Sequence, residues 1–390
     1  MVEAAVLSPR PPARTSADRP LRVMVLADKA RGLAPGQRFR FEQWAPRLAR
    51  DHGITLDLVP FESPELSDLL YKPGHVVSKA VLVTRDFIRR SRAIGEAKDY
   101  DAVLVFREAA LIGPATYERL LARTGTPFIY DFDDAIWSPA QAWGNGLFSR
   151  LHFTGKTSTI CRLAAAVTPG NEFLANYARK RNRNVHVIPT SIELDDYPLI
   201  LEPSNDRPFV VCWTGSTSTL VHFEHAREPL ERLAREVPLV VKVICNKPPE
   251  RPIAGAEMRF VPWSPEREAE ELGDCHAGIM PLPDDEVSRG KCGLKALQYM
   301  ATGRPVVVSP VGVNTDIVQN GTNGFLANST DQFVTALLEL ANSQERRRDM
   351  GREARRTIEE RYSAEVVSRA FAEVVRSVVA RRPHATQKGA

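Results

Sequence analysis

The chain has 390 residues, of which 43% are hydrophobic and 26% are charged, and its formal net charge is +4. These values are typical of a soluble globular protein of two domains, and the small, evenly spread charge argues against a nucleic-acid partner. No stretch approaches the roughly 18 apolar residues that a membrane-spanning helix needs. The five cysteines are scattered without a CxxC pair, so neither a disulfide framework nor a zinc site is indicated and a reducing cytoplasm is expected.

The first elements of the chain form a βαβ unit. Residues 1–20 lack a long apolar core, so we expect a disordered tail rather than a secretory signal. A strand over Leu21–Ala27, a helix ending at Gly53 and a strand over Ile54–Pro60 follow, without the GxGxxG fingerprint of dinucleotide sites. The polar residues at the helix start either face an anion or are merely solvated: Gln37, Arg38, Arg40 and Gln43.

A long helix with a mixed face is predicted over residues 75–96. Apolar and basic side chains alternate along it: Val77, Val81, Phe87 and Ile88 beside Lys79, Arg85, Arg89, Arg90 and Arg92. Such a helix either lies on an anionic membrane surface or is an ordinary domain helix with one solvated side.

An acidic cluster follows the fourth predicted strand. Strands are expected over 100–107 and 127–131, with a helix over 114–124 between them. Asp131, Asp133 and Asp134 come at the end of the second of these strands, and Asp131-x-Asp133 spells a DxD metal motif. Three interpretations stay open: a Mg²⁺ or Mn²⁺ site, a turn or cap without chemistry, or a catalytic role. Trp137 and Trp143 follow, and they predict a loop over an acceptor pocket.

The first sheet is completed by strands over 163–168 and 185–189, with a helix over 171–181. A proline-containing linker over 199–208 leads to the second domain. There, strands are expected over Phe209–Thr214, 239–246 and 257–263, and a hydroxyl-rich loop, 215–219, precedes a helix that ends near residue 235. The loop caps that helix, donates N–H groups to an anion, or does both. His222 and His225 on this helix are predicted to be a surface pair rather than metal ligands.

The last βαβ unit carries the most specific signal. A strand over 275–282 leads through a polar loop, 284–290, to a helix that starts near Lys291 and ends at Gly303, and a strand over 305–309 follows. The loop and helix start concentrate glycines and cations: Arg289, Gly290, Lys291, Gly293 and Lys295. Backbone N–H groups and positive charge at a helix N-terminus indicate a phosphate or diphosphate site, while the alternative is a solvated basic turn.

The segment GKCGLKALQYMATGRPVVVSPVGVNTDIVQNGTNGFLA, residues 290–327, resembles the nucleotide-sugar site of family 4 (group 1) glycosyltransferases, which have the GT-B fold. Several residues fall in register with the family motif: Met300, Ala301, Gly303, Pro305, Val306, Val307, Gly312, Asn323, Gly324 and Phe325. The two glutamates of that motif are absent, because Gly290 and Gln298 stand in their places. In the family the first glutamate contacts the donor sugar and the second contacts the ribose.

The resemblance implies roles for individual residues. On the donor side, Gln298 would contact the ribose, Trp263 would stack on the base, and the sugar contact would shift to Asp284, Asp285 or Glu286. The diphosphate would be held by Gly215, Ser216, Arg289, Gly290, Lys291 and Lys295. On the acceptor side of the cleft the implied residues are Gly36, Arg38, Arg40 and Trp137. Asp133 and Asp134 align with the family's catalytic His-Asp pair, so we expect them to be catalytic.

Together these observations predict an α/β protein of GT-B architecture, with two Rossmann-like domains over 21–198 and 209–363. Helices over Thr330–Asn342 and 344–362 close the second domain, a helix over 364–382 crosses back to the first, and residues 383–390 form a second disordered tail. The expected function is transfer of a sugar, with retention and without a metal or other cofactor, from a nucleotide-diphosphate sugar to a glycan, lipid-linked or small-molecule acceptor. The alternatives are a catalytically silent sugar-nucleotide-binding subunit, or an epimerase or hydrolase of the same fold. The expected location is the cytoplasm, with peripheral membrane contact as one alternative.

Overall fold

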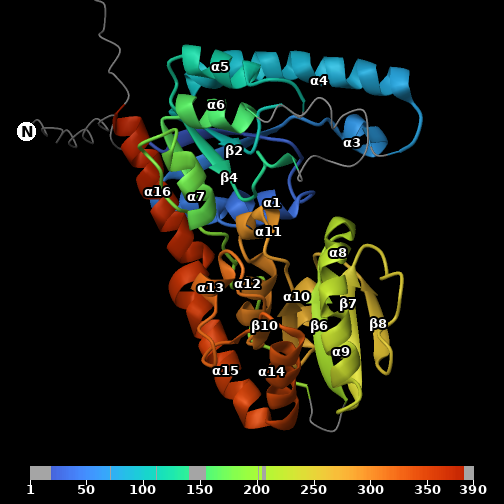
Figure 1. The fold of residues 1–390 in the computed structure, drawn as a ribbon. Coiled ribbons are helices and arrows are strands. Elements are labelled where there is room, and N and C mark those ends of the chain that lie inside the picture. The colour runs from blue at the N-terminus through green and yellow to red at the C-terminus, as the bar shows by residue number, and fades with distance from the viewer. Residues whose placement is uncertain are drawn as a thin grey trace, which may run out of the picture.

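Two parallel β-sheets, each flanked by helices, make up the protein (Figure 1). The computed structural model describes residues 19–70, 72–110, 112–139, 155–200, 202–203 and 208–381. Most of the two predicted tails, the linker residues 201 and 204–207, and the predicted position of Trp143 lie outside these residues. No helix in the described ranges is long and apolar enough to cross a membrane.

The first sheet has the strand order β2-β1-β3-β4-β5 and is parallel throughout. Its strands are β1 (Leu21–Ala27), β2 (Ile54–Pro60), β3 (Ala102–Phe106), β4 (Phe128–Phe132) and β5 (Ala166–Pro169). The prediction of a further strand over 185–189 is wrong, since Val185 forms only an isolated bridge with Val167. The segment still packs on the sheet, since Ile188 is buried in the same cluster as Val23 and Val25, but Pro189 has no N–H with which to extend the pairing.

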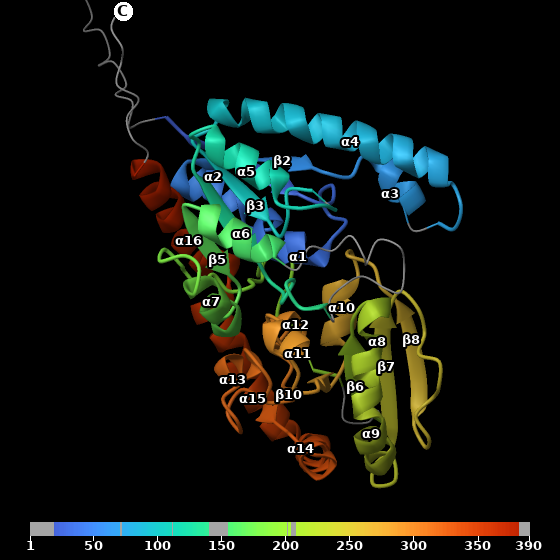
Figure 2. The same cartoon turned by 45° about the horizontal axis from the view of Figure 1, so that its top comes forward.

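Helices of the first half cover both faces of this sheet (Figures 1 and 2). They are α1 (Pro35–Gln37), the π-helical η1 (Arg38–Glu42), α2 (Ala45–His52), α3 (Pro64–Leu70), α4 (Val76–Glu96), η2 (Ala97–Asp99), α5 (Thr116–Arg123), α6 (Lys156–Leu163) and α7 (Glu172–Arg179). Phe39, Trp44 and Leu48, from the stretch between β1 and β2, are all buried. Gly53 ends α2 in the left-handed conformation, which glycine adopts without a steric penalty.

The second sheet has the order β11-β10-β9-β6-β7-β8. Its strands are β6 (Phe209–Thr214), β7 (Leu239–Cys245), β8 (Glu257–Pro262), β9 (Ala277–Met280), β10 (Val306–Val308) and β11 (Phe325–Leu326). The helices are η5 (Thr217–Thr219), α8 (Leu220–Phe223), η6 (Glu224–Ala226), α9 (Arg227–Leu233), α10 (Glu268–Gly273), α11 (Glu286–Gly290), α12 (Leu294–Ala301), α13 (Asn314–Ile317), α14 (Thr330–Asn342), α15 (Gln344–Thr357), the π-helical η7 (Ile358–Tyr362) and α16 (Ala364–Ala380).

The helix predicted from Lys291 begins later, because the polar loop before it contains a short helix of its own. Asp285 caps α11 by accepting a hydrogen bond from the backbone N–H of Ser288. The chain then extends through Lys291 and turns at Gly293, whose φ of +70° lies in the left-handed region, before α12 starts at Leu294.

The terminal helix α16 returns to the first sheet. It packs on α2, β3 and β4, and the ring of Phe371 lies 4.8 Å from that of Trp44. Phe371, Val375 and Val378 share one buried cluster with Val23 and Val25 of β1. The predicted fold class is therefore confirmed: two Rossmann-like sheets linked by a C-terminal helix that crosses back.

Candidate active site

The carboxyl ends of strands from both sheets meet between the two halves of the protein. The turn after β4 contacts the segment after β9, since the Sγ of Cys292 donates to the carbonyl of Asp133 at 3.2 Å. Trp137 Nε1 donates to Glu286 Oε1 at 3.0 Å across the same junction. In Figure 1, α1 and α11 lie where the halves approach each other. Ligands of open α/β sheets bind at such strand ends, so the candidate site is built from both sheets.

Three groups that carry or accept positive charge gather on the side of the second sheet. Lys291 and Lys295 are half-buried, and Lys295 Nζ lies 5.5 Å from the ring centre of the buried Trp213. Burial and the neighbouring Lys291 lower the pKa of Lys295 to about 8. Neither lysine forms an ion pair with any described carboxylate. Like charges held close together without an ion-pair partner repel one another, and a bound anion would relieve that repulsion.

His222 completes this group, which sequence reasoning did not foresee. Burial, together with the positive charges of Lys291 and Lys295, lowers the pKa of His222 to about 4. The Nδ1 atom of His222 is buried and has no hydrogen-bond partner among the described residues. We refer to Lys291, Lys295 and His222 as the cation cluster. The cation cluster suits an anion with several oxygens, because its three members are near enough to shift one another's pKa and each can donate a hydrogen bond to an acceptor.

The hydroxyl-rich loop 215–219 serves first as a helix cap. The N–H of Ser216 donates to Thr219 Oγ1 at 3.0 Å, and the two residues form a reciprocal capping box. The Ser216 N–H is therefore engaged within the loop itself. Gly215 is required by space, because a Cβ there would lie 2.5 Å from the Trp213 ring.

On the side of the first sheet, Asp133 pairs with an arginine. Arg107 follows β3, and its Nε lies 2.8 Å from Asp133 Oδ1. Burial opposes ionisation of Asp133, but Arg107 and Arg40 outweigh it and lower the pKa of this carboxyl. Arg107 itself has a φ of +58°, an uncommon conformation for a residue with a side chain. Gly36 approaches closely, since a Cβ there would lie 2.8 Å from Asp133 Oδ2.

Asp134 faces the cation cluster. Burial raises the pKa of Asp134, while Arg107 and then Lys291 act in the opposite direction. Asp28, which follows β1, is a further carboxyl at the same sheet edge, and burial raises its pKa to about 7. Sequence reasoning missed Arg107 and Asp28, although both lie at the ends of predicted strands that meet at this edge.

Arg40 is not at this surface, which corrects the prediction. Its side chain is fully buried, and its Nη2 and Nε lie 2.6 and 3.1 Å from the two carboxylate oxygens of Asp131. Thr168 Oγ1 donates to Asp131 Oδ2 at 2.7 Å. Both carboxylate oxygens of Asp131 are thus engaged by Arg40 and Thr168. Asp131, the first aspartate of the DxD motif, therefore has no free oxygen for a metal ion. Within the described ranges, no three His, Cys, Asp or Glu side chains group as metal ligands do.

Gly290 lies where the two halves are pressed together. A Cβ on Gly290 would lie 2.7 Å from the Cβ of Ala135 and 2.8 Å from its backbone nitrogen. Asn171 strengthens this contact, because its Nδ2 donates to the carbonyls of Gly290 and Lys291 at 3.2 and 3.0 Å. A glycine therefore replaces the family's glutamate at a position where the turn after β4 occupies the side-chain volume.

The predicted sugar-contacting carboxylates are exposed and have protein partners. Asp284 forms an ion pair with Arg289 at 2.6 Å. The same ion pair neutralises the charge of Arg289, which was predicted to contact the phosphate. Asp285 caps α11, and Glu286 accepts the indole N–H of Trp137. Trp137 stacks on Tyr177 with ring centres 3.8 Å apart, so one face of the predicted acceptor platform is covered.

A buried carboxylate ties together the predicted base and ribose residues. Glu268, the first residue of α10, accepts from Trp263 Nε1 at 2.7 Å, Arg38 Nη1 at 2.9 Å and the hydroxyl of Tyr197 at 2.5 Å. The buried Gln298 donates to the same Tyr197 hydroxyl at 3.0 Å. Arg38, Trp263 and Gln298 are therefore brought together. Arg38, which was predicted to face the acceptor, is bonded to Glu268 of the second half instead. Glu268 had no sequence signal, since it is one of several glutamates in an acidic stretch.

Comparisons with known proteins agree on the fold. Residues 214–343, one third of the chain, match the family model described as Glycosyl transferases group 1. A sucrose-phosphate synthase from Thermosynechococcus elongatus has a similar structure, with a TM-score of 0.64, 16% identity, and coverage of 93% of this chain and 99% of that one. A glycosyltransferase from Rickettsia africae ESF-5 has a TM-score of 0.65, 12% identity, and coverage of 93% and 100%. Anabaena HepE in complex with UDP and glucose has a TM-score of 0.61, 13% identity, and coverage of 92% and 100%. A comparison with curated protein sequences gave no match. Together with the two sheets and the crossing helix, these similarities show that the chain has the GT-B fold.

Proposed function

We propose that this protein is a glycosyltransferase of the family 4 type, which transfers a hexosyl or related sugar from a nucleotide-diphosphate sugar to an acceptor hydroxyl. The observation that carries the proposal is the cation cluster, whose three members influence one another's pKa and form no ion pair with a described carboxylate, and in which the buried Nδ1 of His222 has no hydrogen-bond partner among the described residues. The three residues of the cation cluster lie within the segment that matches the family model. HepE, which has the same fold, has been captured with UDP and with UDP-glucose, and this supports a nucleotide sugar as the donor.

In the proposed reaction, the cation cluster stabilises the negative charge that develops on the departing diphosphate. Fixed positive groups in a partly desolvated site are more effective than water, because they need no reorganisation. The base would lie against Trp263 and the ribose near Gln298, both of which Glu268 and Tyr197 hold in place.

The acceptor would bind on the side of the first sheet, near Asp133, Asp134 and Arg107. Arg107 keeps Asp133 ionised, so this carboxylate would orient the acceptor hydroxyl or stabilise positive charge at the anomeric carbon. We infer retention of configuration and no metal or other cofactor. The acceptor class is a glycan, a lipid-linked sugar or a small molecule, and the proposed place of action is the cytoplasm, in contact with the inner face of the membrane.

One observation favours the alternative of a catalytically silent sugar-nucleotide-binding subunit. Asp284, Asp285 and Glu286 all have protein partners, so none is held ready for a sugar hydroxyl. An epimerase or hydrolase of the same fold would act on the same donor.

A thermal-shift screen across nucleotide sugars, followed by product analysis, tests the proposal. A ligand at one hundred times its dissociation constant stabilises the fold by about 2.7 kcal/mol, which is easily measured. We expect stabilisation by a nucleoside diphosphate and by one nucleotide sugar, and glycosylated product when an acceptor mixture is added. Binding without turnover would indicate the silent subunit, release of free sugar would indicate a hydrolase, and no stabilisation by any nucleotide would contradict the proposal.

A further inference from the structure

The helix α4 presents several apolar residues of its first four turns to solvent instead of to the core. Its buried residues are Asp86, Arg90, Ala93 and Ile94, and no residue from Val76 to Arg85 is buried. Val77, Val81 and Ile88 are 78%, 62% and 52% exposed. With 3.6 residues per turn, these three lie on one side of the helix, roughly opposite the buried face. An exposed apolar stripe on a helix that is anchored by polar residues calls for a partner.

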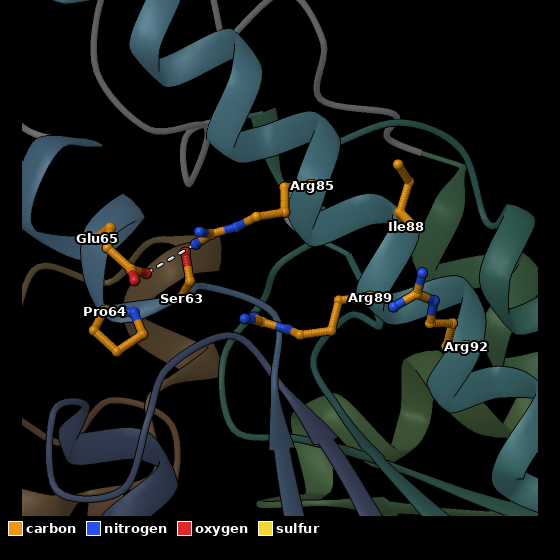
Figure 3. Close-up of a pocket in the computed structure, with 7 residues that line it drawn as sticks. All are labelled: Ser63, Pro64, Glu65, Arg85, Ile88, Arg89 and Arg92. Carbon is orange, nitrogen blue, oxygen red and sulfur yellow. Dashed lines mark hydrogen bonds and ion pairs between the residues drawn. The ribbon is translucent and has the colours of Figure 1, made fainter.

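A basic pocket adjoins this stripe. It has a volume of about 560 Å³, lies between α3 and α4, and is lined by Ser63, Pro64, Glu65, Arg85, Ile88, Arg89 and Arg92. Figure 3 shows Arg85 and Arg89 extending from α4 toward Ser63 and Glu65. Ile88 belongs both to the pocket and to the stripe, so the two features form one continuous surface. We call this surface the α4 face.

The charges of the pocket are only partly balanced. Arg85 Nη2 lies 2.8 Å from Glu65 Oε2, and Arg89 Nη1 lies 3.3 Å from the buried Asp86. Arg89 also donates to the carbonyls of Pro60 and Phe61. Arg92 has no hydrogen bond or ion pair among the described residues. The only other carboxylate exposed on α3 is Asp68, while Lys72 and Lys79 add positive charge beside the start of α4.

We propose that the α4 face docks on an anionic lipid membrane, with the valine stripe in the interface and a lipid headgroup phosphate in the arginine pocket. Apolar side chains next to arginines whose charge is only partly balanced are the combination that binds charged lipid surfaces, because burial of the stripe and attraction to the phosphates act together. Guanidinium groups also suit phosphate oxygens geometrically. The inference deepens the proposed membrane contact by naming the surface and the lipid charge. It does not depend on whether the chain transfers sugar.

Vesicle co-sedimentation of the full chain tests this inference. We expect binding at low salt to phosphatidylcholine vesicles that contain about 30% phosphatidylglycerol, no binding to pure phosphatidylcholine, and release at about 0.5 M salt. The double variant Arg85→Gln/Arg92→Gln should bind about 25-fold more weakly, since each arginine near an anionic surface contributes about fivefold. Val77→Ser/Val81→Ser should also bind at least about tenfold more weakly, because the stripe would lose apolar burial.

The control removes the same charge elsewhere. Arg352→Gln/Arg356→Gln alters two exposed arginines of α15 and should leave vesicle binding within about twofold. A loss as large as in the α4 variant would show that only net charge matters, and would overturn the inference. Binding of glycerol 3-phosphate that depends on Arg85 and Arg92, without vesicle binding, would assign the pocket to a soluble phosphate instead. Failure of the wild-type protein to bind anionic vesicles at low salt would also contradict the proposed membrane docking. The thermal shift caused by a nucleoside diphosphate is measured on the same samples. It tests the proposed function independently of vesicle binding.

Discussion

At the scale of single residues, the candidate site consists of charges whose partners are far away in the sequence. Lys291, Lys295 and His222 lie close together and form no ion pair with a described carboxylate, while Arg107 and Asp133 form an ion pair on the opposite side. The sequence identifies the two lysines because they stand beside glycines at a helix start. It does not identify Arg107 or His222, because a pairing between β3 and β4, or between α8 and α12, leaves no spacing pattern.

Removal of either cluster lysine should weaken nucleoside-diphosphate binding. Lys291→Ala or Lys295→Ala loses a charge-assisted contact of about 1.5–3 kcal/mol, equal to a roughly ten- to hundred-fold weaker affinity. Nucleoside monophosphate should be affected less, and the control Lys247→Ala, which alters an exposed lysine after β7, not at all. Isothermal titration measures all three. An equal loss for nucleoside and diphosphate would mean that the lysines hold structure.

Diphosphate binding should take up a proton through His222. The pKa of this ring in the free protein is about 4, so the ring is neutral at pH 6. A bound anion favours the charged form and raises the pKa, so the complex holds a proton that the free protein lacks. Affinity should therefore increase as the pH falls from about 7 to 5. Titrations in buffers of different ionisation enthalpy measure this uptake, and His222→Gln should leave only the contribution of the phosphate itself. Identical proton uptake in both proteins would rule out the histidine.

Loss of the Asp133 charge should slow turnover and spare donor binding. Asp133→Asn keeps the volume, and turnover should fall at least tenfold, about 1.4 kcal/mol, with donor affinity within a few-fold. EDTA should not affect the wild-type rate, because Asp131 is already saturated by Arg40 and Thr168. Rescue of an EDTA-treated protein by Mn²⁺ would revive the metal interpretation.

At the scale of elements, most strands and long helices could be predicted, because their apolar residues repeat with a clear period. Strands such as β3 and β7 are buried along their whole length, and α14 has its predicted bounds. The predictions were wrong where local chemistry competes with that period. α11 forms in a polar loop because Asp285 caps it, and residues 185–189 contribute only a bridge to the sheet.

The contact between the turn after β4 and residues 289–292 should not tolerate a side chain at Gly290. Gly290→Ala brings a Cβ against the backbone of Ala135, so we expect a loss of about 1–3 kcal/mol in the free energy of unfolding. Gly95→Ala is the matched control. Gly95 lies in the helix α4, and no atom lies within 4 Å of the position that a Cβ would take there, so alanine should stabilise the protein by about 0.5–1 kcal/mol. Urea unfolding measures both, and equal stability of the two variants would show that the junction is looser than described.

At the scale of the whole molecule, the last helix completes the core of the first sheet. Phe371→Ala should cost about 3–5 kcal/mol by leaving a cavity against Trp44, whereas Glu373→Ala on the exposed side should change stability by less than about 0.5 kcal/mol. Hydrogen exchange locates the effect: amides of β1 and β3 should exchange faster, and those of β6 and β7 should not. Faster exchange only in the second sheet would contradict this.

This arrangement has a consequence for synthesis on the ribosome. The strands of the first sheet are complete once Pro169 has been made, but the helix that covers them ends at Ala380. At about 5–20 residues per second, the remaining two hundred or so residues take roughly ten to forty seconds to translate. During that interval the nascent first sheet has an uncovered apolar face where Phe371, Val375 and Val378 will later pack. The helices of the second sheet lie between its strands or end at Tyr362, before the last helix begins, so we expect the second sheet to fold before the first one is finished.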